Sequence, residues 1–386
     1  MPLRSSLLAV LVAVVWGVNF VVIDLGLGDM PPTLFVALRF LVVLVPAVFL
    51  VPRPRARWRD VLLVGTFMSL GQFGLLYTAL ALDMPAGLAS LVLQAQVGLT
   101  VLFAAAALRE VPTRAQLVGV LVGAAGLVVV GVGRSASTPA LAFVVTLAAA
   151  ASWAVGNVVA RRAGRRNQGS TSRDHGSTSR DQGSTSRDHG STSRDHGSTS
   201  RDQGSTSAGR GSSPRPGLEG LSMTVWSALV VPVPMLGLSL ALDGPDAVGH
   251  ALTHLTLAPV LSTLYTAWLA SLVGYGIWNT LLARYPASAV VPFTMLVPPV
   301  GMLAAWVVLD EVPNAAELAG GAVLLLGVAT TTGVLRRRPR AVRPTAAAPG
   351  VVAPHGAEPG DSPGFGEVPD DRAGFGSPGA TRARSR

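Results

Sequence analysis

The sequence predicts an all-α polytopic membrane protein of ten transmembrane helices, arranged as two inverted five-helix repeats. Apolar residues make up 49% of the 386 residues, and charged residues make up 13%, about half of what a soluble domain needs to cover its surface. Apolar stretches of about 18 to 25 residues recur along the chain, and each is long enough to cross a bilayer. A short motif at the end of one stretch returns in the second half of the chain.

Short loops that contain Pro, Asp or Arg separate most of the expected spans, and two hairpins near Pro85 and Pro286 are very tight. The first apolar run follows Arg4 as a secretory signal would. No small-residue cleavage site followed by a soluble domain appears, so we expect an uncleaved first helix. The expected spans are about 5–24, 31–51, 61–82, 86–108, 115–133, 139–160, 219–242, 257–283, 287–309 and 315–335.

The repeat is visible as a five-residue motif that ends one span in each half. Leu108-Arg109-Glu110-Val111-Pro112 returns as Leu309-Asp310-Glu311-Val312-Pro313, 201 residues later. At the same offset Gly119 corresponds to Gly320, and Gly126 corresponds to Gly327. Such self-similarity predicts a duplicated structural unit.

Charges in the loops predict the orientation, because cytoplasmic loops of membrane proteins are enriched in Arg and Lys. With the N-terminus inside, the cytoplasm receives nearly all of the Arg residues. The opposite face receives mostly Asp and Glu, with Arg134 as an exception. The inside residues are Arg53, Arg55, Arg57, Arg59, Arg109, Arg114, Arg161, Arg162, Arg165, Arg166, Arg284 and the cluster 336–343. We therefore expect both termini in the cytoplasm.

Five spans per copy is an odd number, so the second copy must enter the membrane from the opposite side. The duplicated positions differ in charge as this requires, since Arg109 corresponds to Asp310, and Asp83 corresponds to Arg284. Inverted repeats recur in secondary transporters, with the substrate site near the bilayer midplane between the repeats. The pattern therefore predicts a transporter.

The predicted domains are a first repeat at 1–135 and a second at 139–335, interrupted by an insert at 163–217. The insert repeats Gly-Ser-Thr-Ser-Arg-Asp-His/Gln every seven residues and has no apolar seam, so a coiled coil is excluded and disorder is expected. Its His residues, at 175, 189 and 196, are interpreted as part of the repeat expansion rather than as a metal site. The tail at 339–386 is also expected to be a disordered cytoplasmic segment.

No catalytic residue, cofactor or metal site is predicted. The sequence has no nucleophile elbow, phosphate-binding loop, His-Glu-x-x-His motif or clustered carboxylates within its spans, and a membrane enzyme would need such groups. The net charge of +9 lies in loops, insert and tail, where it serves orientation, and no nucleic-acid partner is expected.

Arg39 is the one fixed charge well inside an expected span. A charge at this depth costs several kcal/mol and usually faces a cavity or a partner. One interpretation is a bidentate partner for a substrate carboxylate. The other is a structural Arg that bonds to helix-end carbonyls or extends to the interface.

Five further residues are expected around a central pathway, namely Trp16, Asn19, Gln94, Asn157 and Tyr275. The block at Trp16–Phe20 has a partial counterpart at Trp153–Asn157, and an Asn within lipid needs hydrogen-bonding partners. Asn19 and Asn157 either shape the pathway or fasten helices together. Gln94 and Gln96 lie on different helix faces, so at most one of them is expected to face the pathway.

Several sequence blocks together resemble the ten-helix EamA-type branch of the drug/metabolite transporter superfamily. They include Leu38-Arg39-Phe40, the run from Pro85 through Gln96, and Val273-Gly274-Tyr275-Gly276-Ile277-Trp278. Some blocks look close to members that export O-acetylserine and cysteine. The resemblance covers about residues 1–162 and 218–335, and leaves the insert and tail outside.

The resemblance implies an inner-membrane exporter of small neutral amino acids such as cysteine or O-acetylserine, working by alternating access. Its expected partners are a small-molecule substrate and the lipid bilayer, with a homodimer left open. A DMT-type exporter of another metabolite or drug is one alternative. A non-transporting scaffold or sensor is an alternative of another class, in which the insert and tail bind partners.

Overall fold

A computed structural model describes residues 1–28, 30–54, 56–134, 138–181 and 216–334 of the chain. Helices are the only regular elements in these described ranges, and ten helical segments are long and apolar enough to cross a membrane. The prediction of an all-α polytopic membrane protein is confirmed. The ten segments belong to one compact unit, Met1–Arg337. The predicted tail at 339–386 lies outside the described residues.

The first five spans match the expected stretches closely. They consist of α1 (Leu3–Leu27), α2 (Pro32–Leu50), the combined α3 (Trp58–Val64), η1 (Gly65–Gly71) and α4 (Gln72–Ala81), the pair α5 (Ala86–Val92) and α6 (Ala95–Leu108), and α7 (Arg114–Gly133).

The second five spans are built in the same way. They consist of α8 (Ala140–Asp181), the group α9 (Pro216–Ser227), η2 (Ala228–Val230) and α10 (Pro232–Leu242), the group α12 (Leu257–Leu264), η3 (Tyr265–Gly274) and α13 (Tyr275–Arg284), the group α14 (Ala287–Val290), η4 (Val291–Leu296) and α15 (Val297–Leu309), and α16 (Ala315–Thr332). A further short helix, α11 (Gly244–Thr253), occupies what the sequence suggested was a loop.

Helix α8 differs from the expected boundary, because it continues past the sixth span to Asp181 and enters the predicted insert. Extending an existing helix adds one hydrogen bond for each residue fixed, whereas starting a helix is costly. The polar repeat can therefore be helical where it follows directly on a membrane span. Residues 182–215 of the insert lie outside the described part of the chain.

Five of the described spans depart from regular α-helix, and one of them is the seventh, which contains the short 3₁₀ segment η2. The third contains the π-helix η1, and the eighth contains the π-helix η3. The ninth contains the 3₁₀ segment η4, which begins beside Pro292, as the missing N–H of proline leads one to expect. The fourth breaks at a turn through Leu93 and Gln94, between Gly87 and Gly98.

The two copies of the five-residue motif form the same turn. Arg109 ends α6 and Asp310 ends α15, both in the left-handed conformation, with φ values of 53° and 56°. The following helices both begin with a capping box, Thr113 with Gln116 and Asn314 with Glu317. Residues 201 positions apart thus have the same local structure despite opposite charge.

The bundle has two ends with different chemistry, which we call the arginine face and the acidic face. At the arginine face Glu110 pairs with Arg161 (3.1 Å) and Arg165, while Arg166 lies 3.4 Å from Asp60. The acidic face contains the turns between successive spans near residues 30, 83, 138, 243–256 and 310, where Asp24, Asp83, Asp243, Asp310 and Glu311 lie.

Hydrogen bonds tie together the elements at each end. Ser5 Oγ lies 3.0 Å from Tyr285 Oη at the arginine face. At the acidic face Thr33 Oγ1 donates to Asp243 Oδ2 at 3.3 Å, joining α2 to the end of α10. The grouping of the loops into two ends thus follows the prediction. Which end is cytoplasmic stays a prediction.

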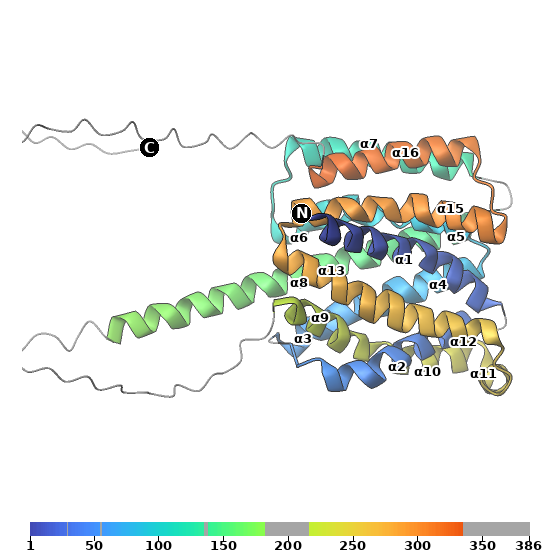
Figure 1. Cartoon of the computed structure of the whole chain (residues 1–386), viewed down its shortest axis with the longest axis horizontal. Coiled ribbons are helices and arrows are strands. Elements are labelled where there is room, and N and C mark those ends of the chain that lie inside the picture. The colour runs from blue at the N-terminus through green and yellow to red at the C-terminus, as the bar shows by residue number, and fades with distance from the viewer. Residues whose placement is uncertain (29, 55, 135–137, 182–215, 335–386) are drawn as a thin grey trace, which may run out of the picture. The chain divides into compact units, whose positions relative to one another are not determined.

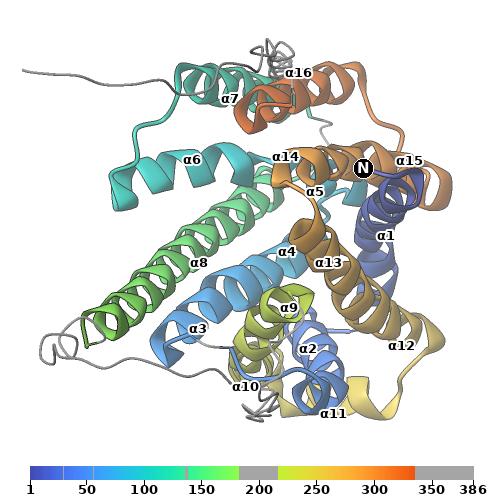
Figure 2. The same cartoon turned by 60° about the vertical axis from the view of Figure 1, so that its left-hand side comes forward.

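Helices α7 and α16 lie side by side along one edge of the bundle, as Figures 1 and 2 show. Glycines let their backbones approach closely, as small residues do between membrane helices. A Cβ added to Gly119 would lie 2.7 Å from the Gly327 carbonyl, and one added to Gly126 would lie 2.6 Å from the Gly320 carbonyl.

Candidate functional site

Arg39 is buried at the centre of the helix bundle, with 2% of its surface exposed. Its Nη1 donates to Tyr77 Oη at 3.0 Å, and its Nη2 donates to Ser271 Oγ at 3.2 Å. Its Nε has no hydrogen-bond partner among the described residues. The side chain therefore neither extends to the interface nor bonds to helix-end carbonyls, which were the structural interpretations of the sequence.

Arg39 carries a positive charge that no carboxylate in the described part of the chain neutralises within 4.0 Å. Its guanidinium carbon lies 4.2 Å from the centre of the Phe73 ring, a cation–π contact that offsets part of the cost of burial. An arginine does not lose its proton in a protein. The site is thus a fixed cation that lacks an anionic partner.

Three different spans hold this cation. Arg39 lies on α2, Tyr77 lies on α4, and Ser271 lies in the π-helix η3. Ser271 Oγ also donates to the carbonyl of Thr266, five residues earlier, at 2.8 Å. The wider π-turn thus sets the position of Ser271, as π-turns often do at functional sites.

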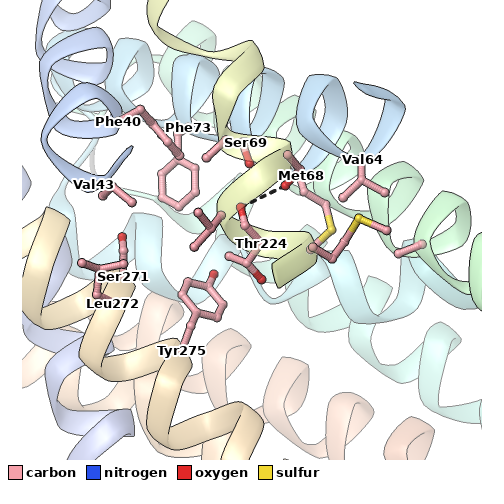
Figure 3. Close-up of a pocket in the computed structure, with 15 residues that line it drawn as sticks. Phe40, Val43, Val64, Met68, Ser69, Phe73, Thr224, Ser271, Leu272 and Tyr275 are labelled. Atoms are coloured by element: carbon pink, nitrogen blue, oxygen red, sulfur yellow. Dashed lines mark hydrogen bonds between the residues drawn. The ribbon is translucent and has the colours of Figure 1, made fainter. Parts of the chain in front are cut away.

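A cavity of about 180 Å³ begins beside Arg39. Ser271 belongs to both, because it lines the cavity and accepts the hydrogen bond from Arg39. Figure 3 shows the rings of Phe73 and Tyr275, Ser69, Thr224 and Met68 around the same space. The residues that line the cavity are Phe40, Val43, Val64, Met68, Ser69, Phe73, Ala160, Met223, Thr224, Val225, Ser227, Ala228, Ser271, Leu272 and Tyr275.

The lining comes from the second, third, sixth, seventh and eighth spans, so both halves of the chain contribute. Apolar and aromatic side chains dominate it, and hydroxyl groups are its polar part. No Asp, Glu, Lys or Arg is among the lining residues. Such a cavity suits a small uncharged side chain, with the neighbouring Arg39 available for an anionic group.

Trp16 joins this site through aromatic contacts. Its ring centre lies 5.1 Å from that of Tyr275 and 5.3 Å from that of Trp278. Its Nε1 donates to the carbonyl of Ala270 at 3.0 Å, within η3. Trp16 and Arg39 thus both form hydrogen bonds with η3, which Tyr275 directly follows. That the three residues form one binding site stays a prediction.

The other three predicted residues lie elsewhere. Asn157 Nδ2 donates to Gln96 Oε1 at 3.2 Å and reaches Thr100 Oγ1 at 3.4 Å, which fastens α8 to α6. Gln94 lines a different, largely apolar cavity of about 470 Å³ between α6, α7, α8 and α16. Asn19 is buried on α1 and its Oδ1 has no partner among the described residues. None of the three lines the cavity beside Arg39.

Sequence reasoning missed Met68, Phe73 and Ser271 as site residues. Ser271 is four positions before Tyr275 and so shares its helix face, a signal that the sequence did contain. Met68 gave no signal of its own. The Met68 side chain fits in its position because residue 156 of α8 is a glycine. A Cβ at Gly156 would lie 2.1 Å from Met68 Cγ.

Ten membrane-length helices around a buried cation and a cavity define an integral membrane protein of the transporter class. The model of the EamA-like transporter family matches residues 3–132 and 214–333. The chain belongs to this family. The matched ranges leave out residues 133–213, which contain the sixth span, Ala140–Arg166, and most of the predicted insert.

Two curated relatives are similar over most of their length. A probable amino-acid metabolite efflux pump of Salmonella typhimurium (strain LT2) is 37% identical over 330 residues, which is 85% of this chain and 94% of that protein. A protein of the same description from Escherichia coli (strain K12) is 34% identical over the same shares.

Two further likenesses are more limited. A probable terminal-alkyne amino-acid exporter of Streptantibioticus cattleyicolor is 31% identical over 134 residues, 35% of this chain and 41% of that protein. A solved crystal structure shares the fold with a TM-score of 0.51 and 19% identity, over 86% of this chain and 98% of that one.

Proposed function

We propose that this protein exports small neutral amino acids or related metabolites, with cysteine and O-acetylserine as the first candidates. The relatives that match most of their own length are described as probable amino-acid metabolite efflux pumps, and the similarity to them covers 85% of this chain. The observation that carries the proposal is the unneutralised Arg39 beside an uncharged cavity.

Arg39 binds the carboxylate of the cargo in this proposal. A carboxylate can accept from the unpartnered Nε and from a second N–H of a terminal nitrogen, while Tyr77 and Ser271 keep their hydrogen bonds to the guanidinium. Charge-assisted hydrogen bonds of this kind are roughly twice as strong as neutral ones. The two hydroxyls hold the guanidinium in place for these contacts.

The cargo side chain occupies the cavity lined by Met68, Phe73 and Met223, with Tyr275 on one wall and Trp16 packed against Tyr275. The absence of charged groups from the lining favours a neutral side chain. Asn157 and Gln94, which the sequence analysis assigned to the pathway, take structural roles in this proposal.

Alternating access between two inverted repeats is the proposed mechanism, with repeats at 1–135 and 139–335. The helix contacts support this mechanism. In the two repeats α1 corresponds to α8 and α6 corresponds to α15, and α1 contacts α15 just as α8 contacts α6. The contacts of η1 and α4 with α8 likewise correspond to those of η3 and α13 with α1. Repeats related in this way can rock against each other about a central site.

The termini are proposed to be cytoplasmic in the inner membrane, as the loop charges predict. The cavity is lined by Val64, Ala160 and Met223, which lie within a few turns of the arginine face. In this orientation the cavity belongs to the cytoplasmic half of the bundle, where an exporter collects its cargo.

Counterflow in proteoliposomes tests the proposal. Vesicles loaded with unlabelled cysteine or O-acetylserine should accumulate the labelled compound through the native protein. Arg39→Gln should abolish this uptake, and Arg39→Lys should reduce it at least tenfold, because an ammonium cannot reproduce the planar guanidinium contacts. Undiminished counterflow by both variants, with folding verified, would remove the carboxylate role.

The alternative functions predict different experimental results. An exporter of another metabolite or drug should show counterflow with that compound and none with amino acids. A scaffold or sensor should need its insert and tail, so deleting residues 182–215 and 339–386 should abolish its cellular effect. Export that survives this deletion supports a transporter whose function resides in the ten spans.

A further inference from the structure

A second polar cavity lies at the acidic face, remote from the cavity beside Arg39. It has a volume of about 240 Å³ and forms between the beginning of α5, the turn from α15 to α16, and the residue before Pro139 at the entry to α8. Three carboxylates line it, and they belong to Asp310, Glu311 and Glu317.

Two of these carboxylates have hydrogen bonds that account for part of their charge. Glu311 accepts from the backbone N–H groups of Ala86 at 2.8 Å and Gly87 at 2.9 Å. Glu317 accepts from the backbone N–H of Asn314 at 3.0 Å. A helix N-terminus is equivalent to about half a positive charge. The helix N-termini beside Glu311 and Glu317 therefore balance about one of the three carboxylate charges and leave about two.

Arg134 is a cation close to this region, but it forms other contacts. Its Nε donates to the carbonyl of Thr138 at 3.2 Å, and its Nη1 donates to that of Gly131. None of its nitrogens lies within 4.0 Å of a carboxylate in the described part of the chain. Asp24 and Asp83 add further negative charge beside Glu311, so the region of the cavity retains an excess of negative charge even with Arg134 nearby.

Thr138 supplies an independent indication of a ligand. Its side chain lines the cavity, its exposed fraction is 3%, and its Oγ1 has no hydrogen-bond partner among the described residues. A buried hydroxyl without a partner costs free energy. A ligand that donates hydrogen bonds would remove this cost and would also balance the charge.

We propose that this cavity binds the primary ammonium group of a small organic molecule. An ammonium carries one positive charge and donates three hydrogen bonds, which matches the excess charge and the free acceptors of Thr138, Asp310 and Glu317. The described acidic residues are not grouped closely enough to hold a metal ion, and the cavity is larger than a bare ion. Both observations argue against a metal ion as the ligand.

The binding itself is independent of the central site, but its role in transport rests on the proposed function. If the acidic face is the outer one, the cavity would hold the amino group of cargo that has left the site at Arg39. A negative vestibule would attract the ammonium end and let the carboxylate end leave first.

The test measures binding of butylammonium to the full-length protein in nanodiscs of neutral phosphatidylcholine, by saturation-transfer difference NMR. The neutral isostere 1-butanol serves as the comparison ligand. Asp310→Asn and Glu317→Gln each remove a charge, and Thr138→Val removes the hydroxyl at nearly constant shape. Asn suits the left-handed position of Asp310, and Gln preserves a capping box, so these variants should fold.

We expect butylammonium to bind at least tenfold more tightly than butanol, and each variant to weaken it at least fivefold. Glu110→Gln at the arginine face is the matched control and should leave binding unchanged. Equal binding of the two ligands, or native affinity in all three variants, would overturn the proposal. Displacement by sodium at equal concentration would also overturn it in favour of a metal-ion site.

The Arg39→Gln variant separates this proposal from the proposed function. It should lose counterflow yet bind butylammonium with native affinity. Ammonium binding without any amino-acid counterflow in the native protein would refute the proposed function alone. Counterflow without ammonium binding would refute the second site alone.

Discussion

Glu311 Oε2 accepts a hydrogen bond from the backbone N–H of Gly87 at 2.9 Å and so joins the end of α15 to the beginning of α5. The other oxygen of the same carboxylate accepts from Ala86. The corresponding residue in the first half, Glu110, pairs instead with Arg161 and Arg165 of α8. One copy of the motif thus clamps the start of the fourth span, while the carboxylate of the other copy forms ion pairs with the sixth.

Loss of the Glu311 clamp should open the acidic face. Glu311→Ala leaves two N–H groups without their acceptors, each worth about 1–3 kcal/mol when charged partners are involved. Because the chain contains no cysteine, a single Leu88→Cys reporter can be added. Its labelling by a membrane-impermeant maleimide should rise several-fold in the Glu311→Ala background, whereas Glu110→Ala should leave it unchanged. Equal labelling in all three backgrounds would refute the clamp.

Removing the hydroxyls that hold Arg39 should weaken transport without abolishing it. Tyr77→Phe and Ser271→Ala each delete one hydrogen bond to the guanidinium, a loss of about 1 kcal/mol. The KM for counterflow should therefore rise about fivefold in each, with a smaller change in maximal rate. Tyr265→Phe is the control, because Tyr265 Oη donates to the carbonyl of Val15 at 2.9 Å and not to the site. An equal effect of the control would indicate general loosening of the bundle.

The two methionines in the cavity should set the size of the cargo. Met68→Ala and Met223→Ala each enlarge the space beside Phe73, and the adaptable thioether is replaced by a small methyl group. Counterflow should shift several-fold toward cargo with longer side chains, relative to cysteine. Met235→Ala removes a methionine that packs on Gly74 outside the cavity and should keep the native preference. An unchanged preference in both cavity variants would show that cargo is selected elsewhere.

The glycine contact between α7 and α16 should be necessary for stability. A Cβ at Gly327 would lie 2.3 Å from the backbone nitrogen of Gly123, so Gly327→Ala must push the helices apart, at a cost of about 1–3 kcal/mol. Gly98→Ala is the control, since its nearest contact would be 3.7 Å. Thermal unfolding in detergent should show a lower Tm for Gly327→Ala alone. Equal Tm values would mean that the pair tolerates a wider spacing.

Most of the fold could be predicted from the sequence, because a span of membrane helix needs only length and hydrophobicity. The expected ends at 86–108 and 287–309 coincide with the observed ones, since Pro85 and Pro286 precede them. The π-helices η1 and η3 could not be predicted. Their wider turns depend on neighbouring helices, such as α8 against Met68, rather than on local propensity.

The site was predicted in part. Arg39 was evident because a charge within an apolar span is costly wherever it lies. Tyr77 and Ser271 as its partners were not evident, because they lie 38 and 232 positions away along the chain. Asn157 and Gln94 had the polarity expected of pathway residues, and only the helix packing directs them toward α6 and a separate cavity.

The sequence by itself determined the membrane class, the ten spans and the equivalence of the turns at Arg109 and Asp310, because these follow from hydrophobicity and local backbone chemistry. The tertiary structure decided which polar groups meet. Whether a buried cation is neutralised depends on its neighbours, and the packing of α2, α4 and η3 brings hydroxyl groups to Arg39 and no carboxylate from the described part of the chain. Side-chain direction and distance between spans are properties of the folded bundle, and no local pattern encodes them.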